Sequence, residues 1–298
     1  MARIGFIGAG AMGAPMIGHL LAAGHELVVH TRRREAAQAL VDQGARWAAT
    51  PAEAARETDF VCTNVTATVD VEKVLFGEDG VAGAAKPGTV VIDFSTISAV
   101  ATREFAERLA KKGIEMLDCP VSGGSMGAQA ATLSIIVGGK AEVLERARPL
   151  LEKLGKTITH IGGHGAGQVV KACNQVVQVV NIQGIAEAML FARANGVDPR
   201  KMLVALQAGM AGSRMLDMMG PKMAGRDFAA GIEARLHQKD FGLVVSMTQA
   251  LGLAMPATAL VSQQLNALVG KGWGRDDTSS LLRVLEGGNP AANDPGGA

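Results

Sequence analysis

The stretch that decides the fold stands near the amino terminus and reads Arg3-Ile4-Gly5-Phe6-Ile7-Gly8-Ala9-Gly10-Ala11-Met12-Gly13. Its first half is a short apolar run typical of a buried strand, its second half is G-x-G-x-x-G, and residues 14–23 continue with helical periodicity. Small glycines let the backbone approach a pyrophosphate, and the free N–H groups at a helix start favour its negative charge. This order of strand, glycine turn and helix predicts dinucleotide contacts at Gly8, Ala9, Gly10, Ala11, Met12 and Gly13.

The first half of the chain continues to alternate between strand-like and helical segments. Further strand-like runs are found at 26–30, 60–65, 89–93, 115–117, 131–137 and 157–161. This alternation indicates an α/β fold with a doubly wound, mostly parallel sheet, in which cofactors lie across the carboxyl ends of strands. Asn64, Val65 and Thr96 follow such strand ends, so we predict that they contact the cofactor. The alternative is that these residues only cap the helices that follow.

The end of the second strand indicates which dinucleotide binds. Folds of this type that select NAD carry an acid about 20 residues past the glycines, where it takes the ribose hydroxyls. This chain has Thr31 there, followed by Arg32, Arg33 and Arg34. Three arginines at a helix start oppose its dipole, whereas a 2′-phosphate would accept their guanidinium groups. We therefore predict NADP as the preferred cofactor, NAD as the alternative, and contacts at Thr31, Arg32 and Arg33.

The second half of the chain has only helical patterns. We expect a Rossmann domain over 1–163, a long interdomain helix over 164–192, an all-α domain over 193–287 and a tail over 288–298. Within the long helix, Lys171, Asn174, Gln175 and Gln178 share one face, while the other faces are apolar. A helix that is apolar nearly all round is buried, so its lysine and amides need partners. Those partners are either a structural network or a bound substrate, with Lys171 as its proton donor.

A second glycine-rich turn follows the strand at 115–117 and contains Ser122, Gly123 and Gly124. Two consecutive glycine amides beside a serine hydroxyl can form an anion-binding nest that suits a carboxylate. A plain tight turn is the alternative.

Composition limits the classes of protein that need to be considered. Hydrophobic residues make up 48% of the chain, charged residues 19%, and the net charge is +1, which describes an ordinary soluble globular protein and not a nucleic-acid surface. No apolar run reaches membrane-spanning length without a polar break, and no signal-peptide pattern precedes the first strand. Cys62, Cys119 and Cys173 lack paired spacing, so we expect reduced thiols, no metal site and a cytoplasmic location.

Four ordered motifs together resemble the β-hydroxyacid dehydrogenases, and the resemblance extends from Met1 to about Leu285. The motifs are Gly5 to Met16, Asp118 to Gly124, Gly165 to Gln175, and Lys239-Asp240. Many members carry asparagine one helical turn after the lysine, whereas here Gln175 holds that place and Asn174 precedes it. This arrangement, like the segment 209–217, looks more like the tartronate semialdehyde reductase branch of the family.

The resemblance implies a role for each matched residue. Lys171 would be the general acid/base, with Asn174 or Gln175 orienting the reacting oxygen; Ser122, Gly123 and Gly124 would hold the substrate carboxylate. Lys239 would lie beside the nicotinamide, and Gln175 and Asp240 would order the substrate site. The implied reaction is hydride transfer between NADP(H) and a small semialdehyde or hydroxy acid. Tartronate semialdehyde, which gives D-glycerate, is the first candidate, before 3-hydroxyisobutyrate and the glyoxylate or succinic semialdehyde substrates.

Other functions are less consistent with the same residues. Relatives that use the fold as a non-catalytic dinucleotide-binding module lose the lysine, and imine reductases usually replace it by Asp or Tyr, whereas this chain keeps Lys171. The decarboxylating 6-phosphogluconate dehydrogenases are much longer. The central helix and several helices after it carry more apolar residues than a small domain readily buries, so we also predict a homo-oligomer, at least a dimer.

Overall fold

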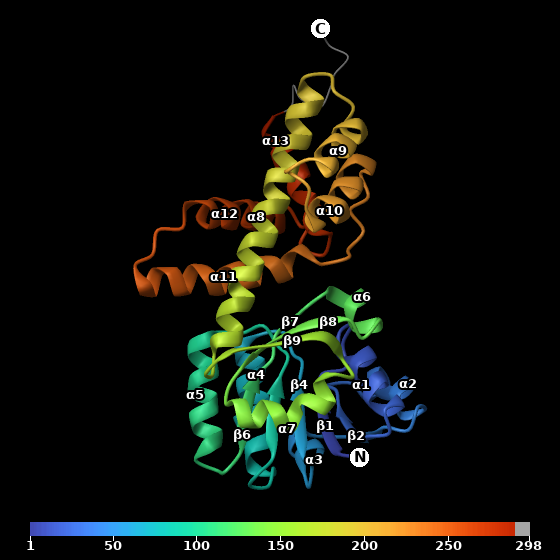
Figure 1. Cartoon of the computed structure of the whole chain (residues 1–298), viewed down its shortest axis with the longest axis vertical. Helices are drawn as coiled ribbons and strands as arrows, with labels where there is room; N and C mark the ends of the chain where they lie inside the picture. Colours follow the sequence, from blue (N-terminus) through green and yellow to red (C-terminus); the bar gives the residue numbers. More distant parts are fainter. Residues whose placement is uncertain (290–298) are drawn as a thin grey trace. The chain divides into compact units, whose positions relative to one another are not determined.

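The computed structural model describes residues 1–289 and divides the chain into two compact units, Met1–Lys171 and Ala172–Ala298 (Figure 1). The expected first boundary lies at residue 163, whereas the contacts divide the chain inside the long helix. Residues 290–298, most of the expected tail, lie outside the described part.

The first unit is an α/β sandwich around one sheet, as the sequence predicts. Its elements are β1 (Arg3–Ile7), α1 (Gly13–Ala22), β2 (Glu26–His30), η1 (Arg34–Ala37), α2 (Gln38–Val41), β3 (Arg46–Ala48), α3 (Pro51–Ala55), β4 (Phe60–Thr63), α4 (Thr68–Phe76), η2 (Val81–Gly83), β5 (Val90–Asp93), α5 (Ala99–Ala110), β6 (Glu115–Asp118), β7 (Val121–Ser122), α6 (Gly124–Gln129), β8 (Leu133–Gly138), α7 (Ala141–Leu151) and β9 (Gly155–Gly162). Strands β3-β2-β1-β4-β5-β6 pair in parallel in that order, while β8 is antiparallel to β6 and β7 and parallel to β9. The doubly wound, mostly parallel sheet is therefore confirmed.

Helices cover both faces of this sheet because successive strand residues point to opposite sides. On β1, Phe6 packs into a cluster with α1, α2 and α7, whereas Ile7 packs into a second cluster with α3, α4 and α5. Both clusters are fully apolar at their centres. The carboxyl ends of β1, β4, β5 and β6 are left to carry polar groups.

The second unit is helical, as expected for the end of the chain. It contains α8 (Ala166–Ala194) from Ala172 onward, then α9 (Pro199–Ala208), α10 (Arg214–Gly225), α11 (Ala234–Leu251), α12 (Pro256–Gly270), η3 (Thr278–Ser280) and α13 (Leu281–Gly288). Val179, Ile182, Ala186 and Met189 recur at helical spacing on α8 and are buried in a common core with the other helices. This core makes α8 the central helix of the unit.

Length and hydropathy alone would let α8 cross a membrane, and 44% of its most apolar window is buried. Core helices of soluble proteins share this property. Because this helix also carries Gln175 and Gln183 as buried polar residues, its composition fits a core helix at least as well as a span.

Candidate active site

The glycine turn between β1 and α1 has two glycines that the protein itself requires and one that it does not. Gly8 has φ +103°, and a Cβ there would lie 2.2 Å from the Asn64 carbonyl oxygen. A Cβ at Gly13 would lie 2.0 Å from the Gly8 carbonyl oxygen, so this glycine lets the helix pack on the turn. A Cβ at Gly10 would meet nothing within 4 Å. The absence of a side chain at Gly10 leaves open space that fits the approach of a pyrophosphate.

The loop after β2 presents two arginines to solvent. Arg34 lies over the Trp47 ring, 5.2 Å from its centroid, and begins η1. Arg32 and Arg33 are exposed, and the guanidinium group of neither makes a hydrogen bond or ion pair to any residue in the range 1–289. The Thr31 hydroxyl donates to the Arg33 carbonyl at 2.7 Å, which holds the loop. Two guanidinium groups without an internal partner suit an anionic ligand at this position.

The loops after β4 and β5 are joined to each other. The Val65 N–H donates to the Ser95 hydroxyl oxygen at 3.0 Å, so this amide already has a partner inside the protein. The Asn64 side-chain amide contacts the Met16 sulfur at 3.6 Å, and Thr96 is only partly buried. The three predicted cofactor contacts therefore lie on neighbouring loops at the carboxyl edge of the sheet, where Val65 offers its carbonyl and side chain and not its N–H.

The predicted turn at Ser122 is the junction of two short elements. Ser122 ends β7, which pairs with β8, and Gly123 and Gly124 begin α6 with φ +132° and φ +62°. Both glycines hold conformations that other residues rarely adopt. The sequence did not predict a strand or helix here, because elements of two and six residues are too short to show a periodicity.

A buried carboxylate that was not assigned a role anchors the start of α8. Asp118, at the end of β6, accepts hydrogen bonds from the N–H groups of Gly165 at 2.8 Å and Gln168 at 3.0 Å. It therefore caps the helix from another element. Burial raises the pKa of Asp118, and these backbone bonds oppose that rise.

Gln168 adds a second anchor for the same helix turn. Its side chain donates to the Ser95 carbonyl at 2.8 Å and accepts from the Ile97 N–H at 3.1 Å. Lys171 lies three residues further along α8 and is only 8% exposed. Gln168 thus extends toward the helix start the polar face that the sequence shows from Lys171 onward. Its position three residues before Lys171 is the sequence signal that could have identified it. The first turn of α8, and with it Lys171, is held against the loop after β5.

In the second unit, four predicted site residues form one chain of contacts. The Lys239 ammonium lies 3.0 Å from Oδ1 of Asp240 as an ion pair. Asp240 Oδ2 accepts from the Gln175 side-chain amide at 2.6 Å, and the Gln175 Oε1 accepts from the Asn174 amide at 2.8 Å. Gln175 and Asp240 are buried. The structure therefore brings Asn174, Gln175, Lys239 and Asp240 together.

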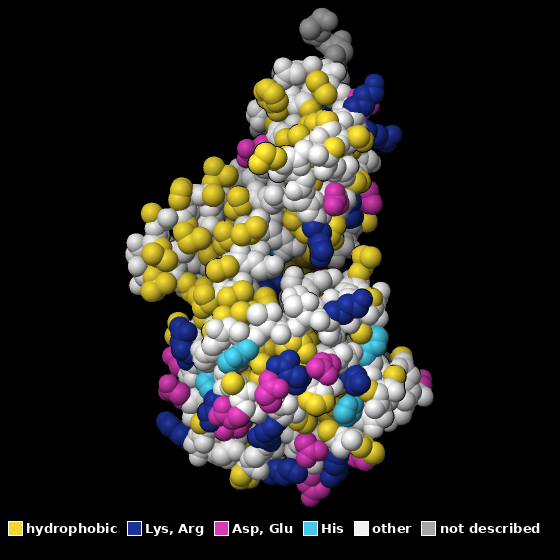
Figure 2. All heavy atoms as spheres, viewed as in Figure 1, with side chains coloured by type: hydrophobic (Ala, Val, Ile, Leu, Met, Phe, Trp, Pro, Cys, Tyr) yellow, Lys and Arg dark blue, Asp and Glu magenta, His cyan; other side chains and the backbone are white. Residues whose placement is uncertain are grey.

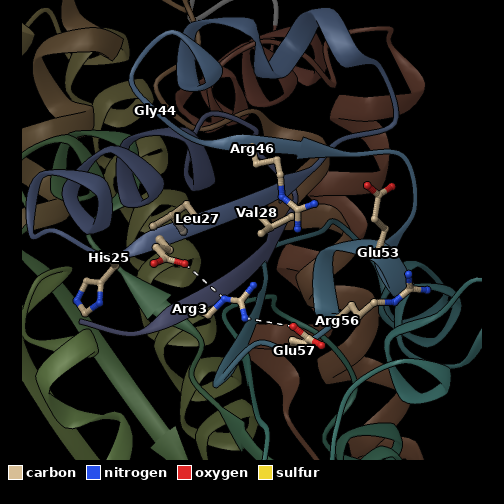
Figure 3. Close-up of a pocket in the computed structure, with 10 residues that line it drawn as sticks. Arg3, His25, Leu27, Val28, Gly44, Arg46, Glu53, Arg56 and Glu57 are labelled. Carbon is tan, nitrogen blue, oxygen red and sulfur yellow. Dashed lines mark hydrogen bonds and ion pairs between the residues drawn. The ribbon is translucent and has the colours of Figure 1, made fainter.

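A polar hollow lies in the first unit (Figure 3). It encloses about 690 Å³ beside the amino ends of β1 and β2, where Arg3 bridges Glu26 and Glu57 at 3.4 Å each. Arg46 and Arg56 also line it. Cofactors of such sheets lie at the opposite, carboxyl edge, so this hollow is not part of the candidate site. Within residues 1–289 no cluster of three or more His, Cys, Asp or Glu could hold a metal ion.

Comparison with known proteins covers almost the whole chain. Residues 3–162 match the family model for the NAD binding domain of 6-phosphogluconate dehydrogenase. Residues 165–285 match the model for NAD-binding of NADP-dependent 3-hydroxyisobutyrate dehydrogenase. The chain therefore carries an NAD(P)-binding domain, as the glycine turn predicts.

Individual relatives agree with the family models. The 2-hydroxy-3-oxopropionate reductase of Escherichia coli (strain K12) is 42% identical over 284 residues, which cover 95% of this chain and 97% of that protein. The NAD-dependent L-serine dehydrogenase of Pseudomonas aeruginosa is 36% identical over 293 residues, with 96% and 98% covered. The solved structure of Mycobacterium tuberculosis 3-hydroxyisobutyrate dehydrogenase with L-serine has a TM-score of 0.89 at 33% identity, covering 96% and 99%. The chain is thus an NAD(P)-dependent oxidoreductase acting on CH–OH groups, and it belongs to the β-hydroxyacid dehydrogenase family.

Proposed function

We propose that this chain reduces 2-hydroxy-3-oxopropionate, that is tartronate semialdehyde, to D-glycerate with NADPH. The observation that carries the proposal is the buried Lys171 on a helix turn that Asp118 and Gln168 fix. A buried lysine held in place is suited to proton transfer at one defined atom. The similarity to a 2-hydroxy-3-oxopropionate reductase supports the substrate over the other acids of the family.

Each group has a role in this reaction. The bound cofactor would supply the hydride. Protonated Lys171 would donate a proton to the carbonyl oxygen as negative charge develops there, a contribution of about 10²–10⁴-fold. The Ser122 hydroxyl and the amides of Gly123 and Gly124 would hold the carboxylate, and this fixed orientation would bring the carbonyl carbon to the hydride donor. In the oxidative direction Lys171 must first be neutral, so that direction is favoured at higher pH.

NADPH preference is part of the proposal. Arg32 and Arg33 stand exposed after β2, their guanidinium groups have no partner in the described part of the chain, and Thr31 stands where an acid would take the ribose hydroxyls. A 2′-phosphate would accept their N–H groups. NAD is the alternative, because the L-serine dehydrogenase relative is named NAD-dependent.

Substituting Lys171 tests the proposal most directly. We expect Lys171→Ala to bind NADPH as the wild type does and to lose at least about a hundredfold in kcat, because only the proton donor is removed. Fluorescence titration with NADPH measures binding, and the aldehyde-dependent loss of NADPH absorbance measures turnover. Wild-type turnover by the folded variant would remove Lys171 from the mechanism.

The substrate itself is tested by comparing aldehydes. Tartronate, methylmalonate, succinic and glyoxylic aldehydes, each with NADPH and with NADH, separate this proposal from a 3-hydroxyisobutyrate dehydrogenase or a glyoxylate and succinic semialdehyde reductase. We expect the highest kcat/KM for tartronate semialdehyde. No oxidoreductase activity on any of them, with cofactor still bound, would favour a non-catalytic dinucleotide-binding module.

A homo-oligomer in the cytoplasm completes the proposal. Large apolar side chains remain exposed on the second unit: Val177, Phe191, Val204, Leu251, Leu253 and Leu260. Hydrophobic side chains gather over α11 and α12 in Figure 2, whereas charged side chains are dispersed over the first unit. Val177 also lines an apolar hollow of about 620 Å³ formed within the second unit. Apolar surface of this extent is typical of a subunit interface.

A further inference from the structure

The chain Lys239–Asp240–Gln175–Asn174 fixes which atom each amide offers. Asp240 forms an ion pair with Lys239, and a carboxylate can only accept hydrogen bonds. Because Gln175 lies 2.6 Å from Asp240 Oδ2, it must turn its NH₂ group there. Its other end, the Oε1 atom, is then also only an acceptor. Amide nitrogen and oxygen are distinguished by their partners, and here the carboxylate settles the assignment.

The same reasoning fixes Asn174. Its NH₂ group faces Oε1 of Gln175 at 2.8 Å and Oε1 of Gln178 at 3.5 Å. Both N–H groups of Asn174 are therefore directed toward amide oxygens. Its Oδ1 accepts no hydrogen bond from any side chain or amide in residues 1–289, and Asn174 is only partly buried. We name Lys239, Asp240, Gln175 and Asn174 the polarity relay. The relay leaves the side-chain oxygen of Asn174 available to accept a hydrogen bond.

We propose that the polarity relay makes Asn174 a hydrogen-bond acceptor toward the substrate, and that the site therefore selects acids with a hydroxyl or ammonium group at C2. The inference rests on the proposed function. There Lys171 serves the oxygen at C3. The substituent at C2 is the remaining polar position of a three-carbon acid, and Asn174 follows Lys171 by three residues on the same helix face.

The chemistry predicts a clear order among substrates. A substrate with a methyl group or a hydrogen at C2 would leave Oδ1 of Asn174 without a hydrogen-bond donor. The site would therefore bind such a substrate less well than one with a hydroxyl or ammonium group at C2. We expect glycerate and serine to exceed 3-hydroxy-2-methylpropanoate and 3-hydroxypropanoate in kcat/KM by at least about tenfold.

The variant Asp240→Asn should reverse the relay. Lys239 favours the oxygen of the new amide, so its NH₂ group would face Gln175. Gln175 must then turn its oxygen toward position 240 and its NH₂ group toward Asn174. Asn174 must turn in the same way, and it would offer N–H groups to the substrate. Discrimination for a C2 donor should fall to about onefold or less.

A second change should restore the polarity. In Gln175→Glu combined with Asp240→Asn, the carboxylate at position 175 accepts from the amide at position 240 and from the NH₂ group of Asn174. Asn174 again offers its oxygen, and the net charge equals that of the wild type. Glu187→Gln is the matched control, because it removes a carboxylate paired with an amide, Gln183, elsewhere on α8.

The experiment measures kcat/KM for the four acids with NADP⁺ in the wild type, the single variant, the double variant and the control. Selectivity that is lost in Asp240→Asn, returns in the double variant and is unchanged in Glu187→Gln supports the relay. Selectivity unchanged in Asp240→Asn, or reduced equally in both variants, overturns it, because packing or charge alone would then account for the effect.

Failure of the proposed function can be recognised separately. If no acid is oxidised with NADP⁺ or NAD⁺, the proposed function is wrong. Calorimetric titration of the cofactor-loaded proteins with the same acids then decides the inference. Tighter binding of acids with a C2 donor to the wild type, the double variant and Glu187→Gln, but not to Asp240→Asn, supports it. Equal affinity of the wild type for acids with and without a C2 donor, or a preference unchanged in Asp240→Asn, overturns it.

Discussion

The burial of Asp93 predicts in which direction the stability of the protein changes with pH. It is fully buried at the end of β5, where Oδ1 accepts from the Thr63 hydroxyl at 2.7 Å and from the Ser95 N–H at 3.0 Å. Its Oδ2 has no hydrogen-bond partner within residues 1–289. Burial raises the pKa of Asp93 from 3.8 to about 6, with a smaller push from Asp118, while the bonds from Ser95 and Thr63 oppose the rise.

The folded protein therefore binds this proton more tightly than the unfolded chain does. The resulting stabilisation is fully present below pH 3.8 and is lost as the pH rises through about 6. A change in pKa of this size corresponds to about 3 kcal/mol. Asp93→Asn keeps an oxygen for Thr63 and Ser95 but cannot ionise. Between pH 3 and pH 8 we expect the free energy of unfolding of Asp93→Asn to rise relative to wild type by about that amount.

Urea unfolding at a series of pH values measures this difference. The chain has 2 tryptophans, and in a Trp273→Phe background the fluorescence of Trp47 reports the first unit alone. Other titrating groups are common to both proteins and cancel in the difference. Asp42→Asn, at an exposed position, is the control and should give a flat difference. A flat difference for Asp93→Asn as well would refute the argument from burial.

Three further predictions concern the cofactor, the anchor of α8 and assembly. Arg32→Ala with Arg33→Ala should raise KM for NADPH and leave KM for NADH nearly unchanged, and a wild type that uses both cofactors equally would contradict this. Gln168→Leu removes two buried hydrogen bonds that fix the helix turn before Lys171. We expect this variant to lose about 2–3 kcal/mol of unfolding free energy and about tenfold in kcat, with cofactor affinity unchanged. An unchanged kcat would refute the role of Gln168 in positioning Lys171. Light scattering on dilution to micromolar concentration should find no stable monomer, and a fully active monomer would exclude the oligomer.

The fold could be predicted because its signals are local and repeated. The strand, turn and helix around Gly8, and the alternation after it, each require only neighbouring residues. The short β7 and α6 could not be predicted, because β7 exists through its pairing with β8 and α6 is six residues long with glycines at its start. Tertiary pairing, which no local pattern records, decides such elements.

The sequence allowed us to predict candidate site residues, but it did not allow us to predict the hydrogen bonds between them. The spacing of Asn174 and Gln175 showed that they share a helix face with Lys171, and the resemblance added Asp240. The bond between Gln175 and Asp240 joins residues 65 apart, so only the packing of α8 and α11 reveals it. The polarity of Asn174 depends on that bond. The hydrogen-bonding direction of Asn174 could therefore be derived only from the structure, although the sequence had already identified each residue of the relay.

The glycines show why a motif alone does not reveal its purpose. A Cβ at Gly138 would lie 2.5 Å from Oδ1 of Asp118, and one at Gly167 would lie 2.7 Å from Oδ2. These glycines make room for the carboxylate that caps α8, so they serve a neighbour inside the protein. Gly10 has no such neighbour, because a Cβ there would meet nothing within 4 Å. Two glycine motifs of similar appearance thus differ in their surroundings: one packs against the carboxylate that caps the helix of Lys171, and the other has open space at Gly10.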